Sequence, residues 1–258
     1  FNMSEGQYVD QNQEDIIAHE LFHHWFGDLV TAESWANLPL NESFATYGEY
    51  LWDEFKYGRD QADFKGLQDL SAYVGNKSKE HEDVIRFDYA DREHMFDEIS
   101  YQKGGRILHM LRKTVGDAAF FKALNLYLTR NAYKTAEIHD LRLVFEEVTG
   151  TDLNWFFNQW FLASGHPVLD IQNTFDPVKK EVSVTIRQNQ DLSKTPLYRI
   201  PMAIDIYING KVERKEIVLD KVKQSFIFPV AGPPDLVNVD AEKYILAEKS
   251  EIKTLQQY

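Results

Sequence analysis

Two histidines, four residues apart, frame the string His-Glu-Leu-Phe-His at residues 19–23. On a helix, residues at i and i+4 lie on one face, so the imidazoles of His19 and His23 can reach a single metal ion. We expect Glu42, in a second segment with apolar patterning, to supply a third ligand. Two histidines and one carboxylate leave a coordination position open for water or substrate, which is the pattern of a catalytic zinc site.

Glu20 follows His19 directly and lies about 100° around the helix from it. Its carboxylate can therefore contact a water bound to the metal more easily than it can coordinate the ion itself. Zinc lowers the pKa of such a water from about 15.7 to about 7, and a neighbouring carboxylate can take its proton and return it to a leaving amine. Glu20 is accordingly predicted to be the general base and acid.

The two histidines require a helix to hold them. Asn12 is a plausible N-cap and Gly27 a plausible C-cap, so the motif is expected inside one helix. Ile16, Ile17 and Phe22 offer apolar anchorage for that helix.

Residues 11–165 are predicted to be mostly α-helical, because their apolar residues recur with helical spacing. The residues expected to start or stop helices are Asp117, Thr135, Asp152, Gly150 and Gly165. The aromatic stripe near the end of this half is typical of core packing. The acidic segment 76–98 has no clean period and is expected to be a surface connection with short helical pieces.

After Pro167 the apolar period changes to two, as in β-strands. The dipeptide Asn209-Gly210 follows one alternating run and indicates a hairpin. Five to seven strands are expected, in a small antiparallel β-sandwich without catalytic residues. The predicted fold is therefore α plus β in two domains: a helical catalytic domain over 1–166 and a β-sandwich over 167–258.

Composition narrows the function classes. The chain has 258 residues, of which 43% are hydrophobic, so a sizeable core is expected. A formal charge of -13 argues against nucleic acid and anionic membrane surfaces as partners. With no cysteine, neither disulfides nor thiolate ligands are expected. No run of about 18 apolar residues predicts a membrane span. No signal peptide is visible, and secreted, periplasmic and cytoplasmic locations all stay open.

The residues after His19 extend the zinc motif into a longer string, His-Glu-Leu-Phe-His-His-Trp-Phe-Gly-Asp, and Asn-Glu-Ser-Phe-Ala begins at residue 41. Together they resemble the gluzincin aminopeptidase family, which includes aminopeptidase N. The resemblance implies zinc held by His19, His23 and Glu42, with Glu20 as base, in a thermolysin-like domain. The string Ser-Gly-His-Pro-Val from residue 164 resembles the hinge of the family into a β-sandwich.

Tyr101 lies in Ser-Tyr-Gln-Lys-Gly-Gly, which resembles the catalytic tyrosine segment of the family. A phenol beside zinc can stabilise the oxyanion that forms when a peptide carbonyl is attacked. On residue type alone, Tyr101 is one of 13 tyrosines, and a packing role would be the ordinary expectation. The matched segment makes it the expected oxyanion donor.

The chain departs from the family pattern in three places. Ser43 stands where glycine is common, and Pro39 where tryptophan is common. The Gly-x-Met-Glu-Asn motif, whose glutamate binds the free α-amine of the substrate, is missing and would lie upstream of Phe1. The sequence is therefore expected to be the later part of a longer protein, with the missing N-terminal portion as its partner. Alone, it is expected to cleave poorly.

The expected function is removal of N-terminal residues from peptides by a zinc-activated water. Three alternatives stay open: a zinc endopeptidase, an epoxide hydrolase, and a non-catalytic peptide-binding module of the same fold. Thr46 and Glu49 can share a helix face with Glu42, and either could orient a metal ligand from behind. His24 is rotated off the ligand face, and the remaining histidines lack paired spacing, so no chemistry is expected of them.

Overall fold

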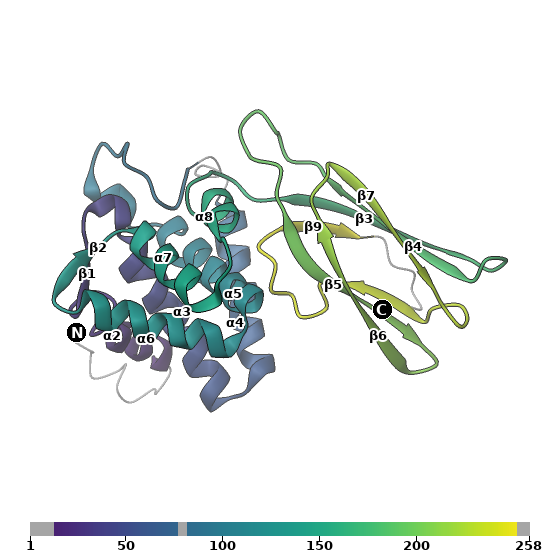
Figure 1. The fold of residues 1–258 in the computed structure, drawn as a ribbon, viewed down its shortest axis with the longest axis horizontal. Helices are drawn as coiled ribbons and strands as arrows, with labels where there is room; N and C mark the ends of the chain where they lie inside the picture. Colours follow the sequence, from purple (N-terminus) through teal and green to yellow (C-terminus); the bar gives the residue numbers. More distant parts are fainter. Residues whose placement is uncertain (1–12, 77–81, 252–258) are drawn as a thin grey trace. The chain divides into compact units, whose positions relative to one another are not determined.

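The computed structural model describes residues 13–76 and 82–251 of the chain (Figure 1). The chain divides between Ser164 and Gly165 into a helical unit and a β unit, each compact by itself. The fold is thus mixed α plus β, as the sequence predicts. The expected domain boundary, between His166 and Pro167, falls slightly later in the chain.

The helical unit begins with two helices that carry the sequence motifs, α2 and α3. Its helices are α2 (Glu14–Phe22), α3 (Pro39–Lys56), α4 (Arg59–Gly75), α5 (Gly104–Val115), α6 (Asp117–Asn131), α7 (Ile138–Thr149) and α8 (Asn154–Trp160). The shorter elements are the 3-10 turns η1 (Trp35–Asn37) and η3 (Arg92–Met95), the π-helical turn η4 (Ile99–Lys103), and strands β1 (Val30–Ala32) and β2 (Lys134–Ala136).

Helix α3 lies at the centre of this unit and packs against α2, α4, η4 and α5. It starts with Pro39 in its first turn, where the missing N–H of proline costs no hydrogen bond. Its buried residues include Leu40, Phe44, Tyr47 and Tyr50, and Phe44 stacks on Phe26 with 4.0 Å between ring centroids and 5° between planes. The helix that carries Glu42 is therefore fixed by neighbours on several sides.

Three helix boundaries differ from the sequence prediction. Helix α8 ends at Trp160 and not near Gly165. Helix α2 ends at Phe22 and not near Gly27, because Phe26 turns inward to stack on Phe44 while the Gly27 N–H pairs with the Val30 carbonyl. The proposed cap Asn12 lies outside the described residues. Thr135 does not start a helix: it belongs to β2, and α7 begins at the capping box of Glu137 and Asp140.

The short strands β1 and β2 pair in parallel, with Thr31 opposite Thr135. The pairing joins the connection between α2 and α3 to the connection between α6 and α7. Asn37 adds a second link here, because its side-chain oxygen accepts the Ile138 N–H at 3.0 Å. These contacts hold the segment that leads from His23 to Glu42.

The β unit has two sheets among the described residues. One has the order β7-β4-β3-β9 and the other β6-β5-β8. The strands are β3 (Val168–Asp176), β4 (Glu181–Gln188), β5 (Ile200–Ile208), β6 (Lys211–Leu219), β7 (Lys223–Pro229), β8 (Leu236–Val239) and β9 (Glu248–Glu251). Alternate residues are buried, as in Val182, Val184 and Ile186 of β4, which is the pattern expected of a two-layer sandwich.

The hairpin predicted at Asn209-Gly210 joins β5 to β6, with Ile208 paired to Lys211. Both turn residues have positive φ, 50° and 72°, as a two-residue type I′ loop requires. The sandwich is not purely antiparallel, however. Strand β9 pairs in parallel with β3, and its short, charged sequence gave no alternating signal.

Candidate active site

The side chains of His19, His23 and Glu42 meet where the end of α2 faces the first turn of α3. Glu42 Oε2 lies 3.3 Å from His19 Nε2 and 3.4 Å from His23 Nε2. The two imidazole rings are 5.0 Å apart and inclined at 80°. Within the described part of the chain, these three residues are the group able to place three donor atoms within 4.8 Å of one another.

This donor set fits a tetrahedral zinc ion. Zinc bonds of about 2.0–2.2 Å to nitrogen and oxygen imply ligand atoms roughly 3.3–3.6 Å apart, which matches the two distances to Glu42 Oε2. That oxygen is buried and makes no hydrogen bond to any described residue. A buried carboxylate oxygen without a hydrogen bond, facing two imidazole nitrogens, is suited to a cation.

The electrostatics of the three residues also favour a cation. Burial alone would lower the pKa of His19, but the carboxylates of Glu42 and Glu49 outweigh it and raise the pKa to about 9. Burial would raise the pKa of Glu42, yet His19 and His23 lower it to about 2. Glu42 is therefore ionised at neutral pH, and a pKa of about 9 means that the His19 imidazole is protonated there as long as no other cation occupies the pocket.

Each histidine is held by a hydrogen bond from its other ring nitrogen. His19 Nδ1 lies 2.8 Å from Glu49 Oε1, and His23 Nδ1 lies 3.2 Å from the carbonyl oxygen of Phe26. A proton on each Nδ1 leaves the Nε2 lone pair directed at Glu42, which is the tautomer a metal ligand needs. Of the two candidates for this supporting role, Glu49 contacts His19. Thr46 instead packs against Gly105, and its hydroxyl makes no hydrogen bond among the described residues.

Tyr101 and Glu20 belong to the same site. The Tyr101 ring stacks on His19, with centroids 5.8 Å apart and planes 9° apart. Burial, and then the negative charge of Glu42 and Glu20, raises the pKa of the Tyr101 phenol. The phenol consequently keeps its proton and can donate it in a hydrogen bond. Glu20 is half-buried on α2, next to His19.

The turn that carries Tyr101 is anchored by residues that sequence reasoning missed. Asp97 Oδ1 accepts the backbone N–H groups of Ile99 and Ser100, both at 3.1 Å. The other oxygen of Asp97 pairs with Arg86 at 2.6 Å, in a buried contact. An Asp two or three residues before a helical turn is a capping signal that could have identified Asp97; Arg86 has no local signal.

Ser43 links this turn to the helix of Glu42. Its hydroxyl donates to the Ser100 carbonyl at 2.7 Å, across a buried interface. The contact needs a glycine opposite, because a Cβ on Gly104 would lie 1.8 Å from Ser43 Oγ. The backbone of α5 thus approaches α3 closely, and the turn that carries Tyr101 lies beside His19.

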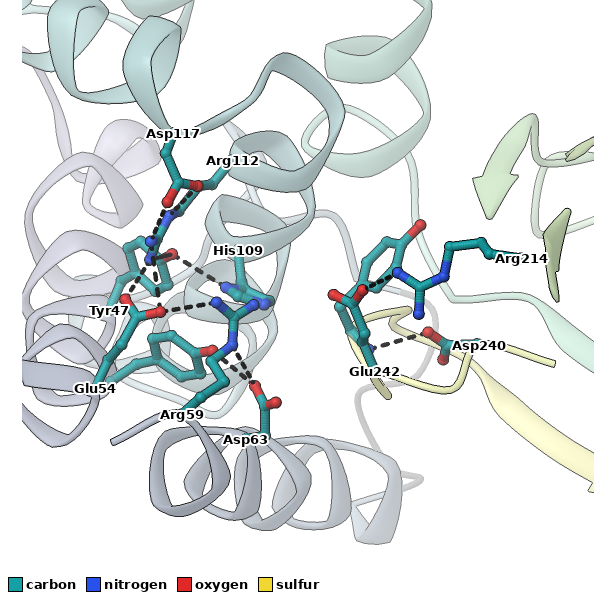
Figure 2. Close-up of polar contacts among 12 residues, drawn as sticks. Tyr47, Glu54, Arg59, Asp63, His109, Arg112, Asp117, Arg214, Asp240 and Glu242 are labelled. Atoms are coloured by element: carbon teal, nitrogen blue, oxygen red, sulfur yellow. Dashed lines mark hydrogen bonds and ion pairs between the residues drawn. The ribbon is translucent and has the colours of Figure 1, made fainter. Parts of the chain in front are cut away.

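The far half of α3 is fixed by a buried charged network (Figure 2). Arg112 of α5 donates to Glu54 at 2.6 Å and to Asp117 at 2.8 and 2.9 Å, and Tyr47 lies 3.1 Å from His109 Nδ1. These contacts tie α3 to α5 at the end of α3 away from Glu42. The network does not touch His19, His23 or Glu42.

Comparisons with known proteins identify the family of the chain. A family model described as "Peptidase family M1 domain" matches residues 2–160. A probable aminopeptidase 1 of Sulfurisphaera tokodaii is 33% identical over 87% of the chain and 28% of its own length. A leucyl aminopeptidase of Saccharolobus solfataricus is 32% identical over 87% of the chain and likewise 28% of its own length.

A solved structure shares the fold. The aminopeptidase A of Legionella pneumophila, crystallised with aspartic acid, aligns with a TM-score of 0.77 over 94% of this chain and 27% of that one, at 22% identity. The chain spans less than a third of the length of these proteins. It belongs to peptidase family M1, the gluzincin aminopeptidases. Over the described residues, no helix is long and apolar enough to cross a membrane.

Proposed function

We propose that this chain carries the zinc-binding half of a metallo-aminopeptidase active site, with His19, His23 and Glu42 as ligands. The observation that supports the proposal most directly is the buried Glu42 oxygen, which lies 3.3 and 3.4 Å from two imidazole nitrogens and lacks a hydrogen bond among the described residues. A zinc ion there would supply Lewis acidity, which lowers the pKa of a water and polarises a carbonyl.

Glu20 and Tyr101 would act on the reacting groups from either side of the ligands. Glu20 would accept a proton from the attacking water and later deliver it to the leaving amine. The Tyr101 phenol, which keeps its proton because its pKa is raised, would donate to the oxyanion of the tetrahedral intermediate. The peptide is the substrate class that fits this set of groups.

The test combines two measurements on the same preparation. Elemental analysis should find about one zinc per chain, since three protein ligands form one site. Aminoacyl anilides should be hydrolysed slowly by this chain and faster by an N-terminally extended form that carries the amine-binding glutamate. A metal-free preparation after incubation with zinc would contradict the metal site, and equal rates for the two forms would contradict the role of the upstream segment.

A peptide with a blocked N-terminus separates the aminopeptidase from an endopeptidase. An exopeptidase should leave an internally quenched, N-acetylated peptide intact while it cleaves the free form. Cleavage of both at similar rates would favour the endopeptidase.

A further inference from the structure

We propose that Lys65 of α4 is a positioning residue for the metal site, which it affects by holding Glu49 against His19. The inference rests on the proposed function, because it assumes that His19 binds zinc. Glu49 divides its two carboxylate oxygens between two partners. Oε1 lies 2.8 Å from His19 Nδ1, and Oε2 lies 2.9 Å from Lys65 Nζ.

Lys65 is itself held in place. Its Nζ also donates to Asp69 Oδ1 at 2.6 Å, one turn further along α4. The side chains of Lys65, Glu49 and Asp69 are 16%, 15% and 10% exposed. Glu49, Lys65 and Asp69 therefore form a mostly buried chain of contacts that leads from His19 to α4. Through this chain, α4 as well as α3 fixes the orientation of the His19 imidazole.

A fixed carboxylate matters because the last torsion of glutamate is broad and roughly two-fold. Lys65 binds one of the two carboxylate oxygens of Glu49. If the carboxylate rotated, it would lose this charged contact in a partly buried environment. Lys65 keeps its charge at neutral pH: burial lowers its pKa, but Asp69 and Glu49 outweigh burial and raise it. Loss of Lys65 would leave Glu49 free to turn from His19, whose ring would then lose its orientation.

An ordinary role for Lys65 in joining α3 to α4 would not explain the arrangement by itself. The two helices are joined elsewhere, because Arg59 pairs with Glu54 at 2.8 Å and Tyr50 donates to Asp63 at 2.7 Å. Helix packing should survive removal of the Lys65 charge. The distinguishing quantity is therefore affinity for zinc, measured separately from the stability of the metal-free protein.

The experiment measures zinc affinity of the full chain by competition with a chromophoric chelator. Lys65→Met should weaken zinc binding by about tenfold to a hundredfold, the usual effect of losing a partner outside the ligand set. Lys65→Arg, which keeps a cation for Glu49, should recover much of the affinity. Arg59→Met is the matched control: it breaks a contact between α3 and α4 that does not reach His19, and it should change zinc affinity by no more than about twofold.

A double-mutant cycle assigns the effect to Glu49. If Lys65 acts through Glu49, then Lys65→Met should cause little further loss of zinc affinity in a Glu49→Gln background. An undiminished loss in that background, or equal zinc affinity of Lys65→Met and the unaltered chain, would overturn the role of Lys65 while leaving the metal site intact. If the unaltered chain binds no zinc, the proposed function fails and this inference fails with it.

Discussion

The helical unit and the β unit treat their buried polar side chains differently. In the β unit, each of several buried polar groups has partners of its own. Asp205 accepts two hydrogen bonds from Arg214, at 2.8 and 2.9 Å, and the Gln188 amide exchanges hydrogen bonds with the backbone of Tyr198. Asp240 pairs with Lys249 and accepts backbone N–H groups of its loop.

In the helical unit, several buried polar atoms have no hydrogen bond among the described residues. They include Glu42 Oε2, Thr46 Oγ1, Lys103 Nζ and His109 Nε2. Each such atom costs about 1–3 kcal/mol, so a fold keeps one where something else uses it. For Glu42 that use is the proposed zinc ion. The difference teaches that Asp205, Gln188 and Asp240 of the β unit are satisfied by neighbouring groups, whereas Glu42 Oε2 of the helical unit is left for the proposed ion.

Removing a ligand should have the largest effect and would test that contrast directly. His23→Ala deletes one of the three donor atoms, so zinc content measured by elemental analysis should fall well below one ion per chain, with loss of peptidase activity. His24→Ala is the control, because the His24 side chain is exposed and pairs with Asp28 at 3.3 Å. Full zinc content in His23→Ala would refute the ligand assignment.

Breaking the network behind α3 should lower the stability of the helical unit. Arg112→Met removes the buried guanidinium that binds Glu54 and Asp117, while Arg59 still pairs with Glu54, so it should cost about 1–3 kcal/mol in the free energy of unfolding. Arg130→Met removes an ion pair to Glu147 that is exposed on both sides and should cost less than about 1 kcal/mol. Urea denaturation compares the two. Similar losses of unfolding free energy in the two variants would mean that the contacts of Arg112 stabilise the protein no more than an exposed ion pair does.

Glu20→Gln should lower kcat by at least about a hundredfold, because it removes acid and base catalysis while keeping the size of the side chain. Zinc content should stay unchanged, which separates this variant from the loss of a ligand. Glu33→Gln, an exposed position, serves as the control. Retained turnover in Glu20→Gln, measured on an aminoacyl anilide, would count against its role.

Much of the fold and of the candidate site could be predicted because the signals are local. The spacing of His19 and His23 specifies a shared helix face, and Asn209-Gly210 specifies a hairpin turn. The supporting contacts could not be predicted in this way. Lys65 reaches Glu49 across two helices, and Arg86 reaches Asp97 through an irregular segment, so neither contact leaves a periodic pattern. Strand β9 was missed for a related reason: four mostly charged residues carry no alternation.

Lys103 shows what an unsatisfied group costs in the helical unit. Burial lowers its pKa to about 7, well below the value of about 10.4 in an unfolded chain. Between these values the unfolded chain binds a proton that the folded chain has released. This group therefore makes stability rise with pH by about 1.4 kcal/mol per unit from pH 7 to about 10, with no change below pH 7.

Lys103→Met should abolish that contribution and stabilise the protein most below pH 7. Urea denaturation at pH 7 and pH 9 measures it as the difference between the variant and the unaltered chain, which cancels the other titrating groups. Lys122→Met changes an exposed lysine and should give a pH profile parallel to that of the unaltered chain. A parallel profile for Lys103→Met as well would show that Lys103 is charged in the folded state.

In the β unit the smallest effect is expected from a polar contact on the surface of a sheet. The hydroxyls of Thr185 in β4 and Ser225 in β7 lie 2.8 Å apart on paired strands. Thr185→Val keeps the branched shape and the strand preference, so the free energy of unfolding should change by less than about 1 kcal/mol. Its neighbour Ile186 points to the other face and is fully buried, and Ile186→Ala should cost about 2–5 kcal/mol. If Thr185→Val cost as much as Ile186→Ala, the stability of the β unit would depend on polar contacts as well, and its contrast with the helical unit would disappear.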